Sequence, residues 1–120
     1  TIKNTNVGIG TITPAAKLDV VGALKVASMA TQSLTTNGYI QIGGLIIQWG
    51  KTASITSGGS AAVTFPMAFP TAALNVQSTL EGTATSNSFA IAVGGISKTG
   101  FTAYSRGSVA GVHSWMAIGY

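Results

Sequence analysis

Short runs with the two-residue period of a β-strand occupy most of the chain after residue 38, and Gly, Ser, Thr, Asn or Pro bounds each run. The runs predict strands over 39–42, 45–49, 61–65, 74–78, 88–94, 101–105 and 114–118. Their regular spacing favours an all-β fold, an antiparallel β-sandwich, over an α/β fold. Pro66 and Pro70 lack backbone donors, so the segment FPMAFP should lie on an edge or outside the sheet.

The first 35 residues predict a different kind of element. Leu18 to Val26 alternates with one apolar face, as a strand does, and Val7 to Gly10 predicts a short extended piece. Thr13-Pro14-Ala15-Ala16, between them, predicts a helical turn or a tight turn. An element this narrow cannot bury its apolar face alone. We therefore expect residues 1–35 to form an intertwined β stem, with 27–37 connecting it to a head over 36–120.

The chain has few charges for its apolar content. Charged residues make up 7% of it and hydrophobic residues 46%, whereas an ordinary soluble domain is about 25% charged. No stretch approaches the ~18 consecutive apolar residues of a membrane-spanning helix. We expect a homo-oligomer whose contacts cover the apolar surface. Because the chain starts at Thr1 without a signal-like stretch, we also expect a fragment of a longer protein or a processed product.

Several classes of partner and cofactor are disfavoured by residue content. The absence of cysteine excludes disulfides and thiolate metal sites. The net charge of +4 comes from scattered residues, whereas nucleic-acid binding normally uses a clustered stripe. Gly8-Ile9-Gly10 has neither the third glycine nor the following helix of a dinucleotide-binding loop. We expect no nucleic-acid partner and no cofactor.

Groups for catalysis are equally sparse. Most glycosidases need two carboxylates, and this chain offers only Asp19 in the stem and Glu81 at a turn of the head, so a pair would have to form across subunits. His113 is the only histidine, and a local hydrogen bond or a solvent-facing position is favoured over a catalytic triad. A metal site would require three copies of His113 around a threefold axis. We therefore expect no enzyme activity.

Three motifs carry a resemblance to a known family. GGLIIQWG, then VTFPMAFP, then the terminal WMAIGY resemble the C-terminal domain at the tips of bacteriophage tail fibres and of related tail-derived bacteriocins. The upstream VGIGTITPAAKLDV is similar to segments that recur in fibre stems. The resemblance implies a parallel homotrimer at the distal end of a virion tail fibre. It also implies that the head binds a host surface glycan, such as lipopolysaccharide, or an outer-membrane protein.

The shared framework does not specify which residues touch a receptor. Trp49, Trp115, Phe65, Phe69 and the ending Ile118-Gly119-Tyr120 match that framework, so we expect them in the core or between subunits. Receptor contacts are expected on loops instead, where packing does not fix side-chain identity.

Two loops supply most of the candidate contacts. The first, 82–88, contains Ser86 and Asn87, although its composition also suits a solvated turn. The second, 104–113, gathers Tyr104, Arg106 and His113, and with Lys98 these residues complete the set. If Phe101 and Ala103 face the core, Tyr104 faces outward.

A tyrosine beside an arginine could stack on a sugar and hold its phosphate or carboxylate. Alternatively, the same two side chains could pack between subunits. The main function hypothesis is a receptor-binding tip, and the alternative is a module that registers and caps the trimer while recognition occurs elsewhere.

Overall fold

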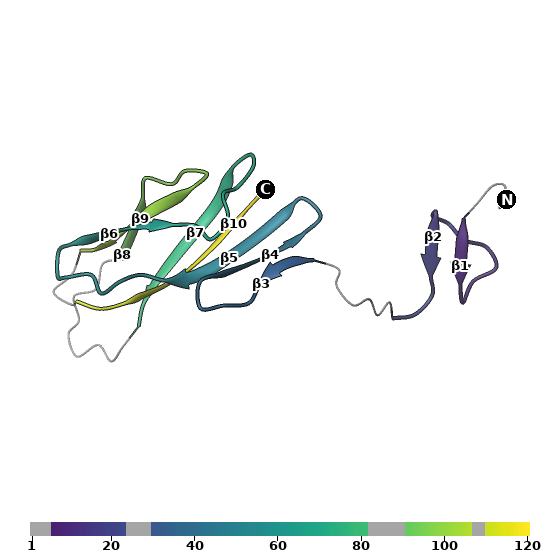
Figure 1. Cartoon of the computed structure of the whole chain (residues 1–120), viewed down its shortest axis with the longest axis horizontal. Helices are drawn as coiled ribbons and strands as arrows, with labels where there is room; N and C mark the ends of the chain where they lie inside the picture. Colours follow the sequence, from purple (N-terminus) through teal and green to yellow (C-terminus); the bar gives the residue numbers. More distant parts are fainter. Residues whose placement is uncertain (1–5, 24–29, 82–90, 107–109) are drawn as a thin grey trace.

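The computed structural model describes residues 6–23, 30–81, 91–106 and 110–120, and the regular structure in these residues is entirely β (Figure 1). The strands are β1 (Val7–Ile9), β2 (Leu18–Val20), β3 (Thr31–Ser33), β4 (Gly38–Ile42), β5 (Leu45–Lys51), β6 (Ser60–Thr64), β7 (Ala73–Leu80), β8 (Ile91–Gly94), β9 (Gly100–Ser105) and β10 (His113–Gly119). Each of the seven predicted runs overlaps one of these strands, which confirms the all-β prediction.

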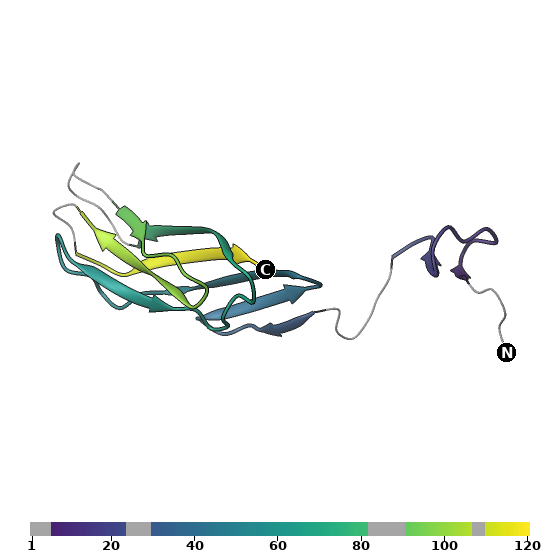
Figure 2. The ribbon, with the colours of Figure 1, turned by 90° about the horizontal axis from the view of Figure 1, so that it is seen from above.

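The head consists of two antiparallel sheets. Five strands pair in the order β3-β4-β5-β10-β7, and three pair in the order β6-β9-β8. The strands of both sheets run along the length of the head (Figures 1 and 2). The predicted antiparallel sandwich is therefore confirmed.

The core lies between the two sheets. Its buried apolar residues come from both: Ile46, Trp115 and Ala117 from the larger sheet, and Val63, Phe101 and Ala103 from the smaller, together with Ile55, Phe65 and Phe69 from connections. Four aromatic rings form its centre, with centroids 5.1 to 5.7 Å apart. Phe65, Phe69 and Trp115 thus lie in the core, one of the two locations expected for the framework aromatics.

The FPMAFP segment lies outside both sheets, as its prolines predicted. Gln48 of β5 is fully buried and holds this segment through the backbone of Met67. Its Nε2 donates to the Met67 carbonyl at 2.7 Å, and its Oε1 accepts from the Met67 N–H at 2.8 Å. A polar side chain in the core therefore fixes the crossing between β6 and β7.

Two features of the head differ from the sequence-based expectation. The segment expected as a connection, 27–37, contains β3, so the head sheet includes residues before position 36. Leu74 was expected to share a core face with Val76 but is exposed. A register shift beside Ile118 and Gly119 adds one residue to β7 at this point, and such a bulge turns side chains away from the regular alternation.

The stem is a two-stranded parallel sheet in which Val7 pairs with Leu18 and Ile9 with Val20. Its strands run parallel and are joined by residues 10–17, an irregular loop with bends instead of the expected helical turn or tight turn. Within it the Ala15 N–H donates to Asp19 Oδ2 at 2.8 Å. The strand predicted from Leu18 ends at Val20, and residues 24–26 lie outside the described part.

Candidate functional site

The register of the strands defines two ends of the head. Thr31, where β3 begins, and Gly119, where β10 finishes, both pair with residues next to the β4–β5 turn. The chain thus enters the head at the end where it also finishes, and we call this the near end. At the opposite, far end, Lys51 pairs with Ser114, and β9 ends there beside Ser60 (Figure 1).

Tyr104 lies on the outer face of the three-stranded sheet at the far end. Phe101 and Ala103 of β9 are buried, and Tyr104 alternates with them and is half-buried. The prediction that it faces outward is confirmed. The neighbouring strands make room for its ring, because a Cβ on Gly94 would lie 3.2 Å from Tyr104 Cε2.

Arg106 follows two residues later and returns over the same ring. Its guanidinium carbon lies 4.9 Å from the centroid of the Tyr104 ring, in a cation–π contact. Arg106 is exposed. The structure therefore brings these two predicted residues together as one unit with an aromatic ring, a hydroxyl and a planar donor fork.

Lys98 lies at the other end of β9. Its Nζ donates to the Pro70 carbonyl at 3.1 Å, and its own carbonyl accepts from the Phe69 N–H. The six residues of β9 separate it from Arg106, which at ~3.3 Å per residue is roughly 20 Å. Within one chain, Lys98 and Arg106 cannot contact the same small ligand.

His113 is fully buried where β10 begins, so its side chain is inaccessible to a receptor or to an ion shared between copies. Its backbone N–H donates to Thr52 Oγ1 at 2.9 Å, and its ring Nδ1 lies 3.3 Å from Ser78 Oγ. Burial lowers the pKa of His113 below its ordinary value. Thr52 and Ser78 are 61 and 35 residues away in the chain, so the structure shows neither the local hydrogen bond nor the solvent-facing position expected from sequence. Ser86 and Asn87 lie outside the described residues.

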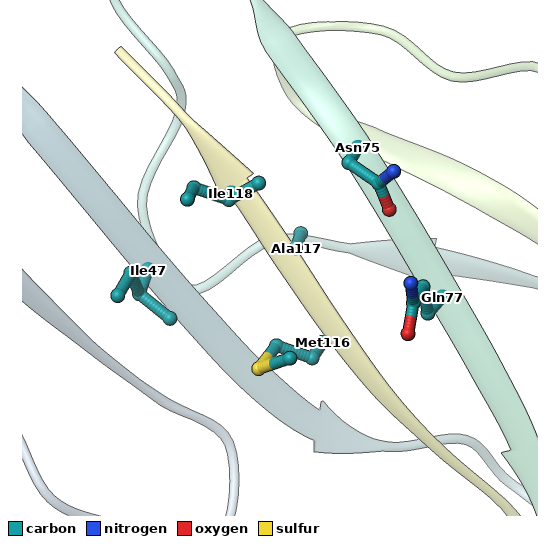
Figure 3. Close-up of a pocket in the computed structure, with 6 residues that line it drawn as sticks. All are labelled: Ile47, Asn75, Gln77, Met116, Ala117 and Ile118. Carbon is teal, nitrogen blue, oxygen red and sulfur yellow. The ribbon is translucent and has the colours of Figure 1, made fainter.

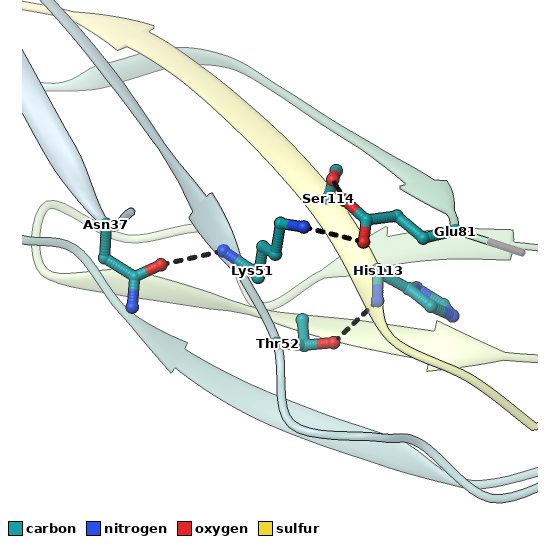
Figure 4. Close-up of polar contacts among 6 residues, drawn as sticks. All are labelled: Asn37, Lys51, Thr52, Glu81, His113 and Ser114. Carbon is teal, nitrogen blue, oxygen red and sulfur yellow. Dashed lines mark hydrogen bonds and ion pairs between the residues drawn. The ribbon is translucent and has the colours of Figure 1, made fainter. Parts of the chain in front are cut away.

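A polar network at the far end was not predicted from sequence (Figure 4). Lys51 Nζ forms an ion pair with Glu81 at 2.9 Å, and Glu81 also accepts a hydrogen bond from Ser114. The bonds from Ser114 and Lys51 lower the pKa of Glu81. Asn37 Oδ1 accepts from the Lys51 N–H at 2.8 Å, which ties the β3–β4 loop to β5. The sequence signal was weak, because these residues are far apart in the chain.

A second feature that sequence reasoning missed is a shallow hollow of about 280 Å³ on the outer face of the five-stranded sheet (Figure 3). It is lined by Ile47, Asn75, Gln77, Met116, Ala117 and Ile118. A sequence signal existed, because Met116 and Ile118 alternate with the inward Trp115 and Ala117 and are apolar as well.

The described residues offer little catalytic chemistry. Asp19 accepts a hydrogen bond within the stem, and Glu81 is engaged by Lys51 and Ser114 in the head. Across the ranges that the structure describes, no cluster of three metal-ligating side chains occurs. These same ranges contain no helix of the length and apolarity needed to cross a membrane.

Comparison with protein families gives one match over most of the chain. Residues 40–120 match the family described as "Putative tail fiber protein gp53-like, C-terminal". No curated protein matches this chain.

Solved pyocin fibres share the fold. An N-truncated R2-type pyocin tail fibre aligns with a TM-score of 0.71 and 26% identity, over 79% of this chain and 39% of that one. A C-terminal part of the R2 pyocin fibre of P. aeruginosa aligns with a TM-score of 0.70 and 26% identity, over 93% of this chain and 34% of that one. An N-truncated R1-type pyocin tail fibre aligns with a TM-score of 0.64 and 30% identity, over 83% of this chain and 100% of that one. The chain thus spans less than half the length of the two R2-type structures.

Proposed function

Because the chain belongs to the family of gp53-like tail fibre C-terminal domains, we propose that it is the receptor-binding tip of a homotrimeric fibre and binds an anionic glycan on the host surface. Membership of this family and the likeness to pyocin fibres place the chain in the tail fibre of a phage or phage-like particle. A surface such as lipopolysaccharide is the proposed target, and binding involves no catalytic step.

The Tyr104–Arg106 unit is the observation that carries this proposal. It lies at the far end of the head, away from the place where the chain enters. In a fibre whose stem leads to the head, that end is directed toward the cell. Arg106 is the only arginine of a chain in which 7% of the residues are charged, and it lies over the half-buried ring of Tyr104.

The geometry suits a sugar that bears phosphate or carboxylate. A guanidinium offers paired N–H donors that match both anions, and a tyrosine contributes an apolar ring with a polar tip. Stacking on Tyr104 restricts the Arg106 side chain before any ligand arrives. Restriction of this kind reduces the entropy lost on binding, which favours affinity.

Three heads on one fibre would add avidity. A repetitive surface allows several weak sites to bind at once, which raises apparent affinity by about 10² or more over a single site. The chain itself supplies reasons to associate, since the stem sheet leaves Val7, Ile9 and Leu18 exposed. A trimer would also place three Tyr104–Arg106 units at fixed spacing.

The test is adsorption of the double variant Tyr104→Ala, Arg106→Gln to cells that the particle recognises, with purified lipopolysaccharide as a second substrate. We expect apparent affinity to fall at least tenfold, which is about 1.4 kcal/mol or more. Lys98→Gln is the matched control, because it also removes one cation but at the near end. Unchanged adsorption of the double variant, or collapse of its trimer, would contradict the assignment.

A module that registers and caps the trimer is the second candidate. The apolar outer face of the five-stranded sheet supports it, since a purely structural module needs no more than packing. Under this function the Tyr104 and Arg106 variants would adsorb as the unchanged chain does, and recognition would map to another part of the fibre.

A further inference from the structure

Gly94 is the last residue of β8, and its own backbone does not require a glycine. The next residue, Gly95, has a φ of 58°, in the left-handed region, whereas the φ of Gly94 lies outside that region. A glycine in a strand loses more conformational entropy on folding than other residues do, and it contributes no side chain to packing. The reason for a glycine at position 94 therefore lies in the space that a side chain would occupy.

That space is filled by Tyr104. A Cβ on Gly94 would lie 3.2 Å from Tyr104 Cε2, 3.8 Å from its Oη and 3.9 Å from its Cζ, and these are the three nearest heavy atoms. Tyr104 pairs with Ala92, so Gly94 is its diagonal neighbour, two residues further along β8. Aromatic side chains are long enough to reach such diagonal positions. The Tyr104 ring therefore leans along β8, with its hydroxyl end beside Gly94.

The position of the ring in turn sets the position of Arg106. The guanidinium carbon lies 4.9 Å from the ring centroid, and Arg106 itself is an exposed residue just beyond the end of β9. A cation–π contact requires the cation to lie over the face of the ring. A side chain at position 94 would push the ring aside and so remove the surface on which the guanidinium rests.

We infer that Gly94 is a positioning residue of the receptor site. By leaving free the space that the Tyr104 ring fills, it keeps the ring where Arg106 stacks, and the donor fork is held ready for an anionic sugar. Gly94 acts through Tyr104 and not through a contact of its own with the ligand. The inference rests on the proposed function and adds to it a residue that sets the geometry of the site.

The variant Gly94→Val fills the space. The two methyl groups of valine extend beyond the Cβ, and its stiff χ1 leaves few ways to turn both away from the ring. Valine suits a strand better than glycine does, so the denaturation midpoint should stay the same or rise. Ala62→Val is the matched control, because Ala62 pairs with Thr102 from β6 as Gly94 does from β8, and it is exposed.

Binding to purified lipopolysaccharide from cells that the particle recognises is the first measurement. Apparent affinity should fall about tenfold in Gly94→Val and stay unchanged in Ala62→Val. In Gly94→Ala it should fall no more than about threefold, because a single methyl group requires only a small shift of the ring.

Nuclear magnetic resonance of the whole chain is the second measurement. Arg106 is the only arginine, so one side-chain Nε–H signal reports its contact with the ring. The difference in the shift of this signal between the native chain and Tyr104→Ala measures the ring current. Gly94→Val should lose most of that difference, and Ala62→Val should keep it.

A double-mutant cycle separates this inference from the proposed function. In the Tyr104→Ala, Arg106→Gln background, Gly94→Val should lower affinity no further. Native affinity or a native Arg106 signal in Gly94→Val, an equal loss in both backgrounds, or the same loss in Ala62→Val would overturn the inference and leave Tyr104 and Arg106 as the proposed contacts. If the Tyr104→Ala, Arg106→Gln variant itself keeps full affinity, the proposed function fails and the inference fails with it.

Discussion

Gln48 offers a quantitative test of how the core positions the FPMAFP segment. Its amide is fully buried and satisfies both the N–H and the carbonyl of Met67. Gln48→Leu keeps the volume but leaves both backbone groups without their partner. Each such group costs about 1–3 kcal/mol, and burial of the leucine recovers part of it. We expect a net loss of about 2–4 kcal/mol in the free energy of unfolding.

The assay is thermal and denaturant unfolding, followed by circular dichroism at one protein concentration, because association also shifts apparent stability. For a head of this size, about 1 kcal/mol corresponds to a Tm change of roughly 4–8 °C. Gln48→Leu should therefore lower Tm by about 10 °C or more. Gln32→Leu, on an exposed position of β3, is the control and should change stability by no more than about 0.5 kcal/mol.

Gln48→Glu adds a pH signature. A protonated carboxyl can donate to the Met67 carbonyl and accept from its N–H, whereas a carboxylate cannot donate. The pKa of this carboxyl should therefore be higher in the folded state than in the unfolded state. Stability should then increase as pH falls through the folded-state pKa toward the unfolded-state pKa. If Gln48→Leu costs less than about 1 kcal/mol, or if Gln48→Glu shows the pH dependence of the unchanged chain, the amide does not hold this segment.

Two further predictions concern β10 and its neighbour. A Cβ on Gly50 would lie 2.6 Å from Trp115 Cζ2, whereas a Cβ on Gly44 meets nothing within 4 Å. Gly50→Ala should therefore lower the denaturation midpoint clearly, while Gly44→Ala should leave it nearly unchanged. Because burial lowers the pKa of His113 from 6.5, the unfolded chain binds its proton more readily. Stability should be constant above about pH 7 and fall as pH decreases through 6.5. His113→Gln should flatten this slope between pH 7 and 5, measured by denaturant titration at each pH, and a slope that persists would assign it to another group.

The strands with clear alternation could be predicted from sequence, whereas β3 could not. Its residues Thr31, Gln32 and Ser33 include no apolar side chain, so period alone carries no signal there. The strand forms because the edge of β4 offers backbone partners. Leu74 was misplaced for a related reason, since a bulge depends on the register of two strands and leaves no mark in one of them.

The candidate site could be predicted in part. Tyr104 and Arg106 are two residues apart, and the strand period correctly placed Tyr104 on the outer face. The burial of His113 could have been anticipated, because it shares its parity with the inward Trp115 and Ala117. The separation of Lys98 from Arg106 could not, since it depends on where β9 begins and ends.

The two faces of β10 explain why the chain finishes on an almost continuous apolar run. Trp115 and Ala117 are buried in the sandwich core, while Met116 and Ile118 lie on the outer face of the sheet. Strands covered on both faces carry near-continuous apolar runs, whereas half-solvated strands alternate. The composition of WMAIGY is therefore that of a strand that is apolar on both faces, with one face in the core of its own sandwich and the other on the outer side of the sheet. Under the proposed function, residues that vary with the receptor belong on the opposite sheet, around Tyr104, whereas the ending belongs to the framework of the fold.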